Sequence, residues 1–295
     1  MSDLDRQLVA VLGASSLVGA HLLQQLHDAG CVAHAFSRSH RAKDSDGAIW
    51  HICSEASLAD ITNLELCICA APIWVLPEFF PQLLASGVRR VVALSSTSVF
   101  TKQDSLDVRE RRLSQKIADA EHTVRQWAQV HGVECVILRP TLIYGSAADK
   151  GIMVIAKFIK RFSFFPLCGK ASGLRQPVHS RDVANACVSA LHKQGAEGMD
   201  FNLSGGETLT YREMVSRVFV ACGLRPRLVA LPVFVFRLGF FVLRLLPRYR
   251  HWSLGMALRM NHDQTCDHAE ALSVLGFSPQ KFILQSNDLP AESKR

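Results

Sequence analysis

The sequence lacks the features of a secreted or membrane-spanning protein. Its 295 residues contain no uncharged apolar run of about 18 residues, the length at which a segment becomes a candidate for crossing a bilayer. The first seven residues, MSDLDRQ, are acidic and polar, whereas a secretory signal is basic and then apolar. We therefore expect a cytoplasmic protein.

The sequence also lacks a metal-binding or disulfide pattern. Its nine cysteines are scattered, and only Cys67 and Cys69 lie close together. No CxxC pair and no His/Cys cluster has the spacing of a zinc site. We expect no metal, and we interpret the cysteines as small core residues in a reducing compartment.

Acidic residues are missing from one long segment, between Glu213 and Asp263. The net charge of +7 is therefore partly local, because eight arginines fall in that interval: Arg217, Arg225, Arg227, Arg237, Arg244, Arg248, Arg250 and Arg259. They alternate with apolar runs such as LVALPVFVFRLGFFVLRLLP and not with the aromatic residues of a nucleic-acid-binding strand. A membrane or a phosphate group fits this pattern better than a nucleic acid.

What the sequence does contain is an alternation of short apolar runs with helical patterns. A hydrophobic content of 48% in a chain of this length can form a large core. The alternation predicts βαβ units and a parallel sheet. The expected strands are LVAVLG, CVAHAFS, AIWHIC, ELCICAA, RVVALSS and VECVILRP.

The turn after the first expected strand, GASSLVG, is typical of a phosphate-binding loop. Gly13 permits a tight turn, Gly19 permits close packing of the helix on the strand, and the free amides at the helix start favour a pyrophosphate. Ser16 stands in place of the middle glycine and puts a Cβ where the backbone usually approaches the ligand. An ordinary strand-turn-helix is the alternative.

The second expected strand ends in SRSHRAK and not in an acidic residue. An acidic residue there would bind a ribose 2′-hydroxyl, whereas Arg38, with Ser37 and Arg41, suits a 2′-phosphate. NADP is therefore favoured over NAD. The alternative is a solvated basic loop.

Six segments together resemble one family: GASSLVG, SRSHRA, VVALSSTSVF, LRPTLIYG, RQPVHSRDVA and NLSGGETLTYREMV. In order and spacing they resemble the extended short-chain dehydrogenase/reductase superfamily, in its NAD(P)-dependent epimerase/dehydratase branch. The resemblance implies an α/β fold, a Rossmann doubly wound parallel sheet with a smaller, mostly helical C-terminal substrate lobe. The core is expected in residues 1–145, with 178–204 returning to it, and the substrate lobe in 146–177 and 205–295.

The resemblance also implies a set of cofactor-binding positions near the expected strand ends. These are Gly13, Ser15, Ser16, Leu17, Val18, Gly19, Ser37, Arg38, Arg41, Ala70, Ala71, Lys116, Pro140 and Thr141.

For a small-molecule substrate, the resemblance implies that Ser96 polarises an oxygen, that Thr97 lies beside it, and that Arg175 binds a diphosphate. A serine that merely closes a strand end is the alternative for Ser96. His179 and Asp182 match a structural pair, with Asp182 expected as the N-cap of the following helix.

Tyrosine is scarce, and this affects the expected chemistry. The family's proton donor is a tyrosine four residues before a lysine, but counting back from Lys116 gives Arg112, and no YxxxK occurs in the chain. An arginine keeps its proton far above neutral pH. Two alternatives stay open: Tyr144 swings towards the site, or Lys116 itself serves with a pKa lowered by burial.

The alignment of this helix with the family's helix is itself open by one residue. Asp119 and Glu121 lie on either side of the place where the family's helix carries a glutamate. Lys116 is otherwise expected to orient the nicotinamide ribose.

The basic, apolar segment 228–260 has two interpretations. Arg237 and Arg244 are seven residues apart and share one helix face, and Phe234, Leu238, Phe241 and Leu245 lie on another. Such a helix either packs on the core with its arginines outward or lies peripherally on the inner face of a membrane.

Three classes of function follow. The first is an NADP-dependent epimerase, dehydratase or reductase acting on a nucleotide sugar or a related precursor with a non-standard acid/base. The second is a catalytically silent NADP-binding sensor or assembly factor. The third is a membrane-associated reductase of a lipid substrate.

Overall fold

A seven-stranded sheet forms the centre of the computed structural model, which describes residues 7–38, 47–53, 58, 60–61, 63–145, 149, 151–237, 254–285 and 288–289. The strand order is β11-β6-β5-β4-β1-β2-β3, and every neighbouring pair is parallel. The strands are β1 (Leu8–Leu12), β2 (Val32–Ser37), β3 (Ile49–Ile52), β4 (Leu66–Cys69), β5 (Arg90–Leu94), β6 (Glu134–Pro140) and β11 (Asp200–Leu203). Strands β4 and β5 are buried along their whole length, as a sheet covered on both faces requires. The predicted Rossmann-like α/β fold is confirmed.

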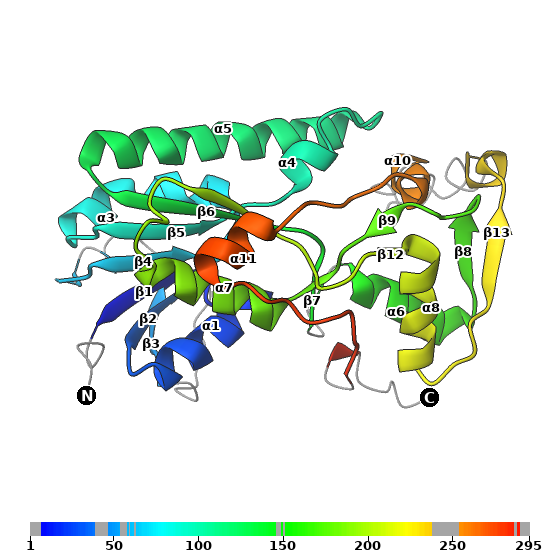
Figure 1. Cartoon of the computed structure of the whole chain (residues 1–295), viewed down its shortest axis with the longest axis horizontal. Coiled ribbons are helices and arrows are strands. Elements are labelled where there is room, and N and C mark those ends of the chain that lie inside the picture. The colour runs from blue at the N-terminus through cyan, green and yellow to red at the C-terminus, as the bar shows by residue number, and fades with distance from the viewer. Residues whose placement is uncertain are drawn as a thin grey trace.

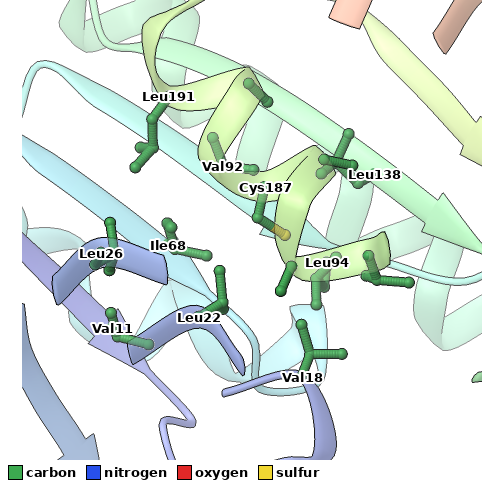
Figure 2. Close-up of a cluster of buried hydrophobic side chains, with 14 of the residues drawn as sticks. Val11, Val18, Leu22, Leu26, Ile68, Val92, Leu94, Leu138, Cys187 and Leu191 are labelled. Carbon is green, nitrogen blue, oxygen red and sulfur yellow. The ribbon is translucent and has the colours of Figure 1, made fainter. Parts of the chain in front are cut away.

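Helices cover both faces of this sheet (Figure 1). Helices α1 (Leu17–Asp28) and α7 (Ser180–His192) lie on one face. Figure 2 shows their side chains packed against the strands: Leu22, Leu26, Cys187 and Leu191 meet Val11, Ile68, Val92, Leu94 and Leu138. The other face is covered by η1 (Ile73–Phe79), α3 (Phe80–Ala85) and α5 (Val108–His131).

Helix α5 has clear signals at both ends. The Asp107 side chain accepts a hydrogen bond from the Arg109 amide at the N-terminus, and Gly132 ends the helix in the left-handed region with φ 66°. Short α4 (Ser98–Thr101) connects β5 to it. This arrangement carries the N-terminal half of α5 past the carboxyl ends of the central strands, where α/β sheets place ligands.

A smaller lobe follows the sheet and has its own core, built around Phe219, Ile159 and Met214. Its elements are α6 (Ile152–Phe162), β8 (Phe165–Cys168), β9 (Leu174–Arg175), β12 (Leu209–Thr210), α8 (Tyr211–Ala221), β13 (Leu228–Leu231), α10 (Leu254–Leu258) and η3 (Arg259–Asn261). Strand β13 pairs with β8 in parallel, and β12 pairs with β9 antiparallel. Between the lobe and the sheet, β7 (Ile143–Tyr144) pairs with β10 (Val178–His179).

The chain returns to the sheet after forming this lobe. Helix α11 (Ala269–Leu275) packs Ala271 and Leu275, with nearby Phe277, into the cluster under α1 and α7. The sequence placed all of 205–295 in the lobe, so the structure differs here. A short apolar helix carries no sequence signal of which core it joins.

No helix within the described ranges is long and apolar enough to span a bilayer. All nine cysteines are free, and six of them are buried, which fits their interpretation as core residues. The described part of the chain holds no group of three or more His, Cys, Asp or Glu side chains placed to bind a metal ion.

Candidate functional site

The turn between β1 and α1 packs directly against the end of β4. The amides of Gly13 and Ala14 both donate to the Phe36 carbonyl, each at 3.2 Å. Gly13 has φ +76°, and a Cβ there would lie 2.5 Å from the Ala71 amide nitrogen. Only glycine fits this position, which agrees with the tight turn expected from the sequence.

Helix α1 begins close against the same turn. A Cβ on Gly19 would lie 2.3 Å from the Ala14 carbonyl oxygen, so this glycine permits the approach. Ser16 is the N-cap, because its hydroxyl accepts a hydrogen bond from the Gly19 amide at 3.1 Å. The amides of Leu17 and Val18 belong to the first turn and have no intrahelical acceptor. They are donors of the kind that bind a phosphate at a helix N-terminus.

Ser16 therefore has a role that its sequence position did not reveal. The residue replaces a glycine of the expected motif, and its side chain caps the helix. Ser15 beside it is exposed, so its hydroxyl is accessible at the mouth of the turn.

The end of β2 supplies one accessible cation. Ser37 is buried, and its carbonyl accepts a hydrogen bond from the Cys53 amide at 2.6 Å. Arg38, the next residue, is exposed. Arg41 lies outside the described residues. The predicted contact with a 2′-phosphate therefore depends structurally on Arg38.

The ends of β4 and β6 complete the edge of the sheet beside this turn. Ala70 donates to the Leu12 carbonyl at 2.8 Å, and Ala70 and Ala71 are both partly exposed. Thr141 donates its amide to the Leu203 carbonyl at 3.0 Å, and its hydroxyl donates to the Gln176 carbonyl. Pro140 is buried, so any ligand contact there is made by main-chain atoms.

Ser96 and Thr97 follow β5 but have different environments. The Ser96 hydroxyl accepts a hydrogen bond from the Ser98 amide at 3.1 Å and is partly exposed. Thr97 is 6% exposed, and its hydroxyl donates to the Pro140 carbonyl at 3.2 Å. Ser96 keeps a hydroxyl proton to donate, whereas the burial of Thr97 speaks against the substrate contact predicted for it.

The inward face of helix α5 carries apolar side chains where a proton donor and its lysine were expected. Ile117 is 3% exposed, and Leu113, one turn earlier, packs partly buried against the same cluster. Lys116 is exposed, and its ammonium lies 4.4 Å from the centre of the Trp74 ring. Arg112 is exposed as well. The pair counted from Lys116 thus faces outward.

The most buried charged group on α5 is Glu121, which is 3% exposed. It accepts hydrogen bonds from Arg139 at 2.8 and 2.5 Å, from Arg125 at 3.0 Å and from Ser95 at 2.5 Å. Burial alone would raise the pKa of Glu121, but the bonds from Arg139 and Ser95 outweigh it and hold the pKa below its usual range. Arg139 also donates to Asp200 at 2.8 Å.

This network was only partly foreseen. The sequence marked Glu121 as a position near the family's glutamate, but not as the centre of a buried cluster. No local pattern joins α5, β6 and β11. The cluster fixes the rotation of α5 against the sheet.

Tyr144 is held in the core and away from solvent. It is 0% exposed, and its hydroxyl donates to the Lys281 carbonyl and accepts from the Ile283 amide, both at 3.3 Å. Burial raises its pKa to about 12. These contacts favour its structural role over the proton-donor alternative.

Arg175 is buried against the backbone of the lobe. Its guanidinium donates to the carbonyls of Leu174 and His262, each at 2.7 Å, and of Arg259 at 2.5 Å. It is 4% exposed, and burial lowers its pKa to about 10. The predicted diphosphate contact does not fit these bonds, which already use three of its donors for backbone carbonyls.

Two other cations lie between the lobe and the start of α5. Arg259 forms an ion pair with Glu110 at 2.9 Å. Burial lowers the pKa of nearby Lys102, and so does the charge of Arg259. Sequence reasoning missed this junction because 149 residues separate Glu110 from Arg259 in the chain.

The helix cap predicted at Asp182 lies instead at His179. The Nδ1 atom of His179 accepts a hydrogen bond from the Arg181 amide at 3.1 Å, whereas Asp182 accepts one from the Gln280 amide at 3.0 Å. The prediction for Asp182 was wrong because α7 begins at Ser180, so that its N-cap falls three residues earlier than expected. Asp182 instead ties the C-terminal segment to the core.

A hollow of about 580 Å³ lies elsewhere on the described surface. It lies between the C-terminal halves of α1 and α7, lined by Gln25, Asp28, Asn185, Val188, Ser189, His192 and Lys193. In a parallel α/β sheet this is the amino edge of the strands, opposite to the edge where ligands bind. We therefore do not assign it to the site.

Comparison with known proteins gives a partial family match. Residues 80–204 match the NAD dependent epimerase/dehydratase family. UDP-glucose 4-epimerase of Vibrio cholerae is 21% identical over 217 residues, which are 70% of this chain and 61% of that protein. Subunit 9 of the NADH dehydrogenase [ubiquinone] 1 alpha subcomplex, mitochondrial, from Arabidopsis thaliana, is 33% identical over 100 residues, which are 34% of this chain and 25% of that protein.

The solved structures show the same fold across nearly the whole chain. UDP-glucose 4-epimerase of Thermotoga maritima, solved with UDP-glucose, has a TM-score of 0.69 at 15% identity and covers 92% of this chain and 93% of its own. UDP-glucuronic acid 4-epimerase of Bacillus cereus, solved with NAD, has a TM-score of 0.69 at 14% identity, covering 92% and 91%. By contrast, the chain aligns with less than two thirds of each curated relative, between 23% and 61% of their lengths.

Proposed function

We propose that this chain is an NAD(P)-binding protein of the epimerase/dehydratase type that has lost tyrosine-dependent hydride chemistry. The observation that carries the proposal is the inward face of α5. Leu113 and Ile117, four residues apart, occupy that face beside the ends of the central strands. Neither side chain can give or take a proton.

The next turn of the helix supports this position for the reacting pair. Glu121 lies four residues after Ile117 and faces inward as well. Side chains at this spacing project from one face of a helix, so Leu113, Ile117 and Glu121 form a single stripe. From the sequence alone, the alignment of this helix with the family's helix was open by one residue. The stripe favours the alignment in which Ile117 occupies the position of the family's lysine.

The phosphate-binding turn supports retention of the dinucleotide. Gly13 and Gly19 allow the backbone of the turn and the start of α1 to pack closely, and the amides of Leu17 and Val18 are available to an anion. When bound, a nicotinamide dinucleotide supplies a ring that accepts or gives a hydride. This chain's own contribution is binding and orientation at the strand ends.

A preference for NADP is part of the proposal and depends on Arg38. The residue is exposed at the end of β2, where the sequence offers no acidic partner for a ribose hydroxyl. The solved neighbours that name a dinucleotide name NAD. The likeness of fold therefore does not support this preference, and the guanidinium alone does.

The curated relatives suggest a role for a protein that binds a dinucleotide without catalysing a reaction. Two of them, from Arabidopsis thaliana and Dictyostelium discoideum, are subunits of mitochondrial NADH dehydrogenases. A subunit or assembly factor uses the bound nucleotide to stabilise a fold and its surface. We propose this class of role for the whole protein.

An enzyme acting on a nucleotide sugar is the second candidate. It is favoured by Ser96, whose hydroxyl is accessible at the end of β5. Such an enzyme needs a proton donor other than Tyr144, which is buried with a pKa raised to about 12. Lys116 is exposed on α5, with its ammonium over the Trp74 ring, so it is not the buried lysine that this alternative requires.

The test measures binding and turnover separately. Calorimetric titration of the purified chain with NADP and NADPH should show binding, while incubation with UDP-glucose and UDP-glucuronic acid should change neither the sugar nor the nicotinamide absorbance. Turnover at ordinary enzymatic rates would contradict the loss of chemistry. Absence of binding to NADP and NAD alike would contradict the proposal as a whole.

A pair of variants tests the position of the reacting pair. Leu113→Tyr combined with Ile117→Lys restores the two groups on the inward face, and Arg112→Tyr beside Lys116 is the matched outward control. If either variant gains a slow substrate-oxidising activity, we expect the gain in the Leu113→Tyr, Ile117→Lys variant. A gain confined to Arg112→Tyr would show that the outward position is the correct one.

A further inference from the structure

Two exposed phenylalanines form a turn at the end of α6. Phe162 is 50% exposed and Phe164 is 38% exposed. Ser163 between them ends the helix in the left-handed region, with φ 59°. The ring of Phe158 lies 4.7 Å from the Phe162 ring and 5.8 Å from the Phe164 ring, measured between centroids. We call this feature the Phe162–Phe164 turn.

More apolar side chains are exposed on the strand pair that follows the turn. Strand β8 pairs with β13, on which Val229 is 42% exposed. Beyond β13, Val233 is 43% exposed and Phe234 is 69% exposed. Figure 1 shows β8 and β13 at the end of the molecule away from the seven-stranded sheet. We call the outer surface of this strand pair the distal face of the lobe, with the Phe162–Phe164 turn before the start of β8 and with Val233 and Phe234 beyond the end of β13.

The charge around the distal face has one sign. Residues 151–170 and 222–237, which include α6, β8 and β13, contain seven Lys and Arg and no Asp or Glu. The exposed cations among them are Lys157, Arg161, Lys170, Arg225, Arg227 and Arg237. The guanidinium of Arg161 lies 5.5 Å from the centre of the Phe162 ring. Aromatic groups and cations are therefore adjacent.

We propose that the distal face of the lobe binds the surface of an anionic lipid bilayer. Exposed aromatic side chains enter the boundary between headgroups and acyl chains, and adjacent basic residues are attracted to anionic lipids. A second copy of the chain fits less well, because pairing two such faces brings cations of the same sign together. The proposal is independent of the proposed function.

The structure changes the location expected from the sequence. The sequence placed membrane contact in 228–260, on a helix carrying Arg237 and Arg244. Arg244 and the rest of 238–253 lie outside the described residues. The structure adds the end of α6, which is about 70 residues earlier in the chain and is brought beside the start of β13 because Phe165 on β8 pairs with Leu228.

The experiment is sedimentation of the full chain with vesicles of phosphatidylcholine, alone or mixed with phosphatidylglycerol. We expect binding to the mixed vesicles at low salt and release at high salt, because screening weakens attraction between exposed charges. Phe162→Ser with Phe164→Ser should lower the partition coefficient about ten-fold or more. Arg161→Glu with Arg227→Glu should lower it by a similar factor of about ten.

Matched controls lie at the other end of the molecule. Val130 on α5 is 71% exposed, and Arg89 before β5 is exposed. Val130→Ser and Arg89→Glu should leave vesicle binding within about two-fold of wild type, because neither residue lies on the distal face. Far-ultraviolet circular dichroism and thermal unfolding verify that every variant is folded.

Three results would overturn the proposal. The first is failure of the wild type to bind anionic vesicles at low salt. The second is binding that the folded Phe162→Ser, Phe164→Ser variant retains in full. The third is light scattering in which these substitutions convert a dimer to a monomer while vesicle binding is absent, which would assign the face to a contact between copies.

Discussion

Arg139 donates two hydrogen bonds to Glu121, at 2.8 and 2.5 Å, and thereby joins the end of β6 to the middle of α5. The Glu121 side chain is 4% exposed and the Arg139 side chain is 11% exposed. A buried pair of this kind contributes little over an apolar pair, but the loss of one partner leaves the other charge buried without compensation. The pair therefore controls how α5 is rotated against the sheet.

Glu121→Ala should lower the free energy of unfolding by about 3–5 kcal/mol. Glu134→Ala is the control, because the Glu134 side chain is 48% exposed and its buried partner Arg90 keeps a second carboxylate, Glu197, at 3.1 Å, so the loss should be about 0–1 kcal/mol. Urea denaturation of both variants measures the difference. Equal losses of unfolding free energy in the two variants would show that the buried network contributes no more to stability than the Glu134–Arg90 pair.

The same carboxyl group predicts a dependence of stability on acid. Its pKa is held below the usual value of 4.5 in the folded protein, so its contribution is present above that pH and is lost as pH falls through the folded pKa. Denaturation midpoints of wild type and Glu121→Ala should converge in acid. A constant difference between them down to pH values well below 4.5 would contradict this linkage.

Ile117 and Lys116 should lose unequal amounts of stability when each is replaced by alanine. Ile117→Ala removes a buried side chain and should cost about 2–5 kcal/mol of unfolding free energy. Lys116→Ala removes an exposed cation stacked on Trp74 and should cost about 0.5–1 kcal/mol. Thermal denaturation separates the two. A large loss at Lys116 with little at Ile117 would reverse the assignment of the inward face.

Arg38→Ala should weaken NADP binding by about 1.5–3 kcal/mol, the contribution of a hydrogen bond to a charged group. Binding of NAD, which lacks the 2′-phosphate, should change little. Calorimetric titration of both dinucleotides against wild type and variant gives the comparison. Equal affinity of the wild type for NAD and NADP would refute the preference, and so would NADP affinity that Arg38→Ala leaves unchanged.

The cap of α7 at His179 predicts a response near neutral pH. Burial lowers the pKa of this imidazole below 6.5, against the opposing charges of Asp288 and Asp182, and Nδ1 must be unprotonated to accept from Arg181. The unfolded chain binds the proton more readily, so stability falls as pH falls from about 6.5 through the folded pKa.

His179→Asn keeps a residue that caps helices well and has no titration in this range. Its free energy of unfolding should fall less than that of the wild type between neutral pH and pH of about 5. Chemical denaturation at several pH values measures the two slopes. Parallel slopes would show that His179 does not contribute and that other histidines cause the dependence.

Much of the fold could be predicted from the sequence because its signals are local. Apolar runs of strand length, separated by helical periodicity, indicate a parallel sheet, and the structure has that sheet in the order β11-β6-β5-β4-β1-β2-β3. Gly13 and Gly19 could also be identified, because a positive φ and a close backbone approach leave no room for a side chain. These requirements act within a few residues.

The candidate site was less predictable because its geometry depends on contacts between distant segments. Arg175 was expected at a diphosphate, yet it binds the carbonyls of Arg259 and His262, which are 84 and 87 residues away. Asp182 was expected as a cap, yet it accepts from Gln280, 98 residues away. A motif gives the residue type at a position but not which distant backbone group will reach it.

The sequence by itself determined that this chain has a glycine-containing turn after its first strand and no YxxxK pair, because both are properties of residue identity and short spacing. Only the tertiary structure decided which side of α5 faces the sheet. Ile117 and Lys116 are adjacent, and a rotation of the helix by about 100° exchanges their environments. That rotation is set by the packing of Leu113 and Ile117 and by the bond between Glu121 and Arg139, which form only when the helix meets the folded sheet.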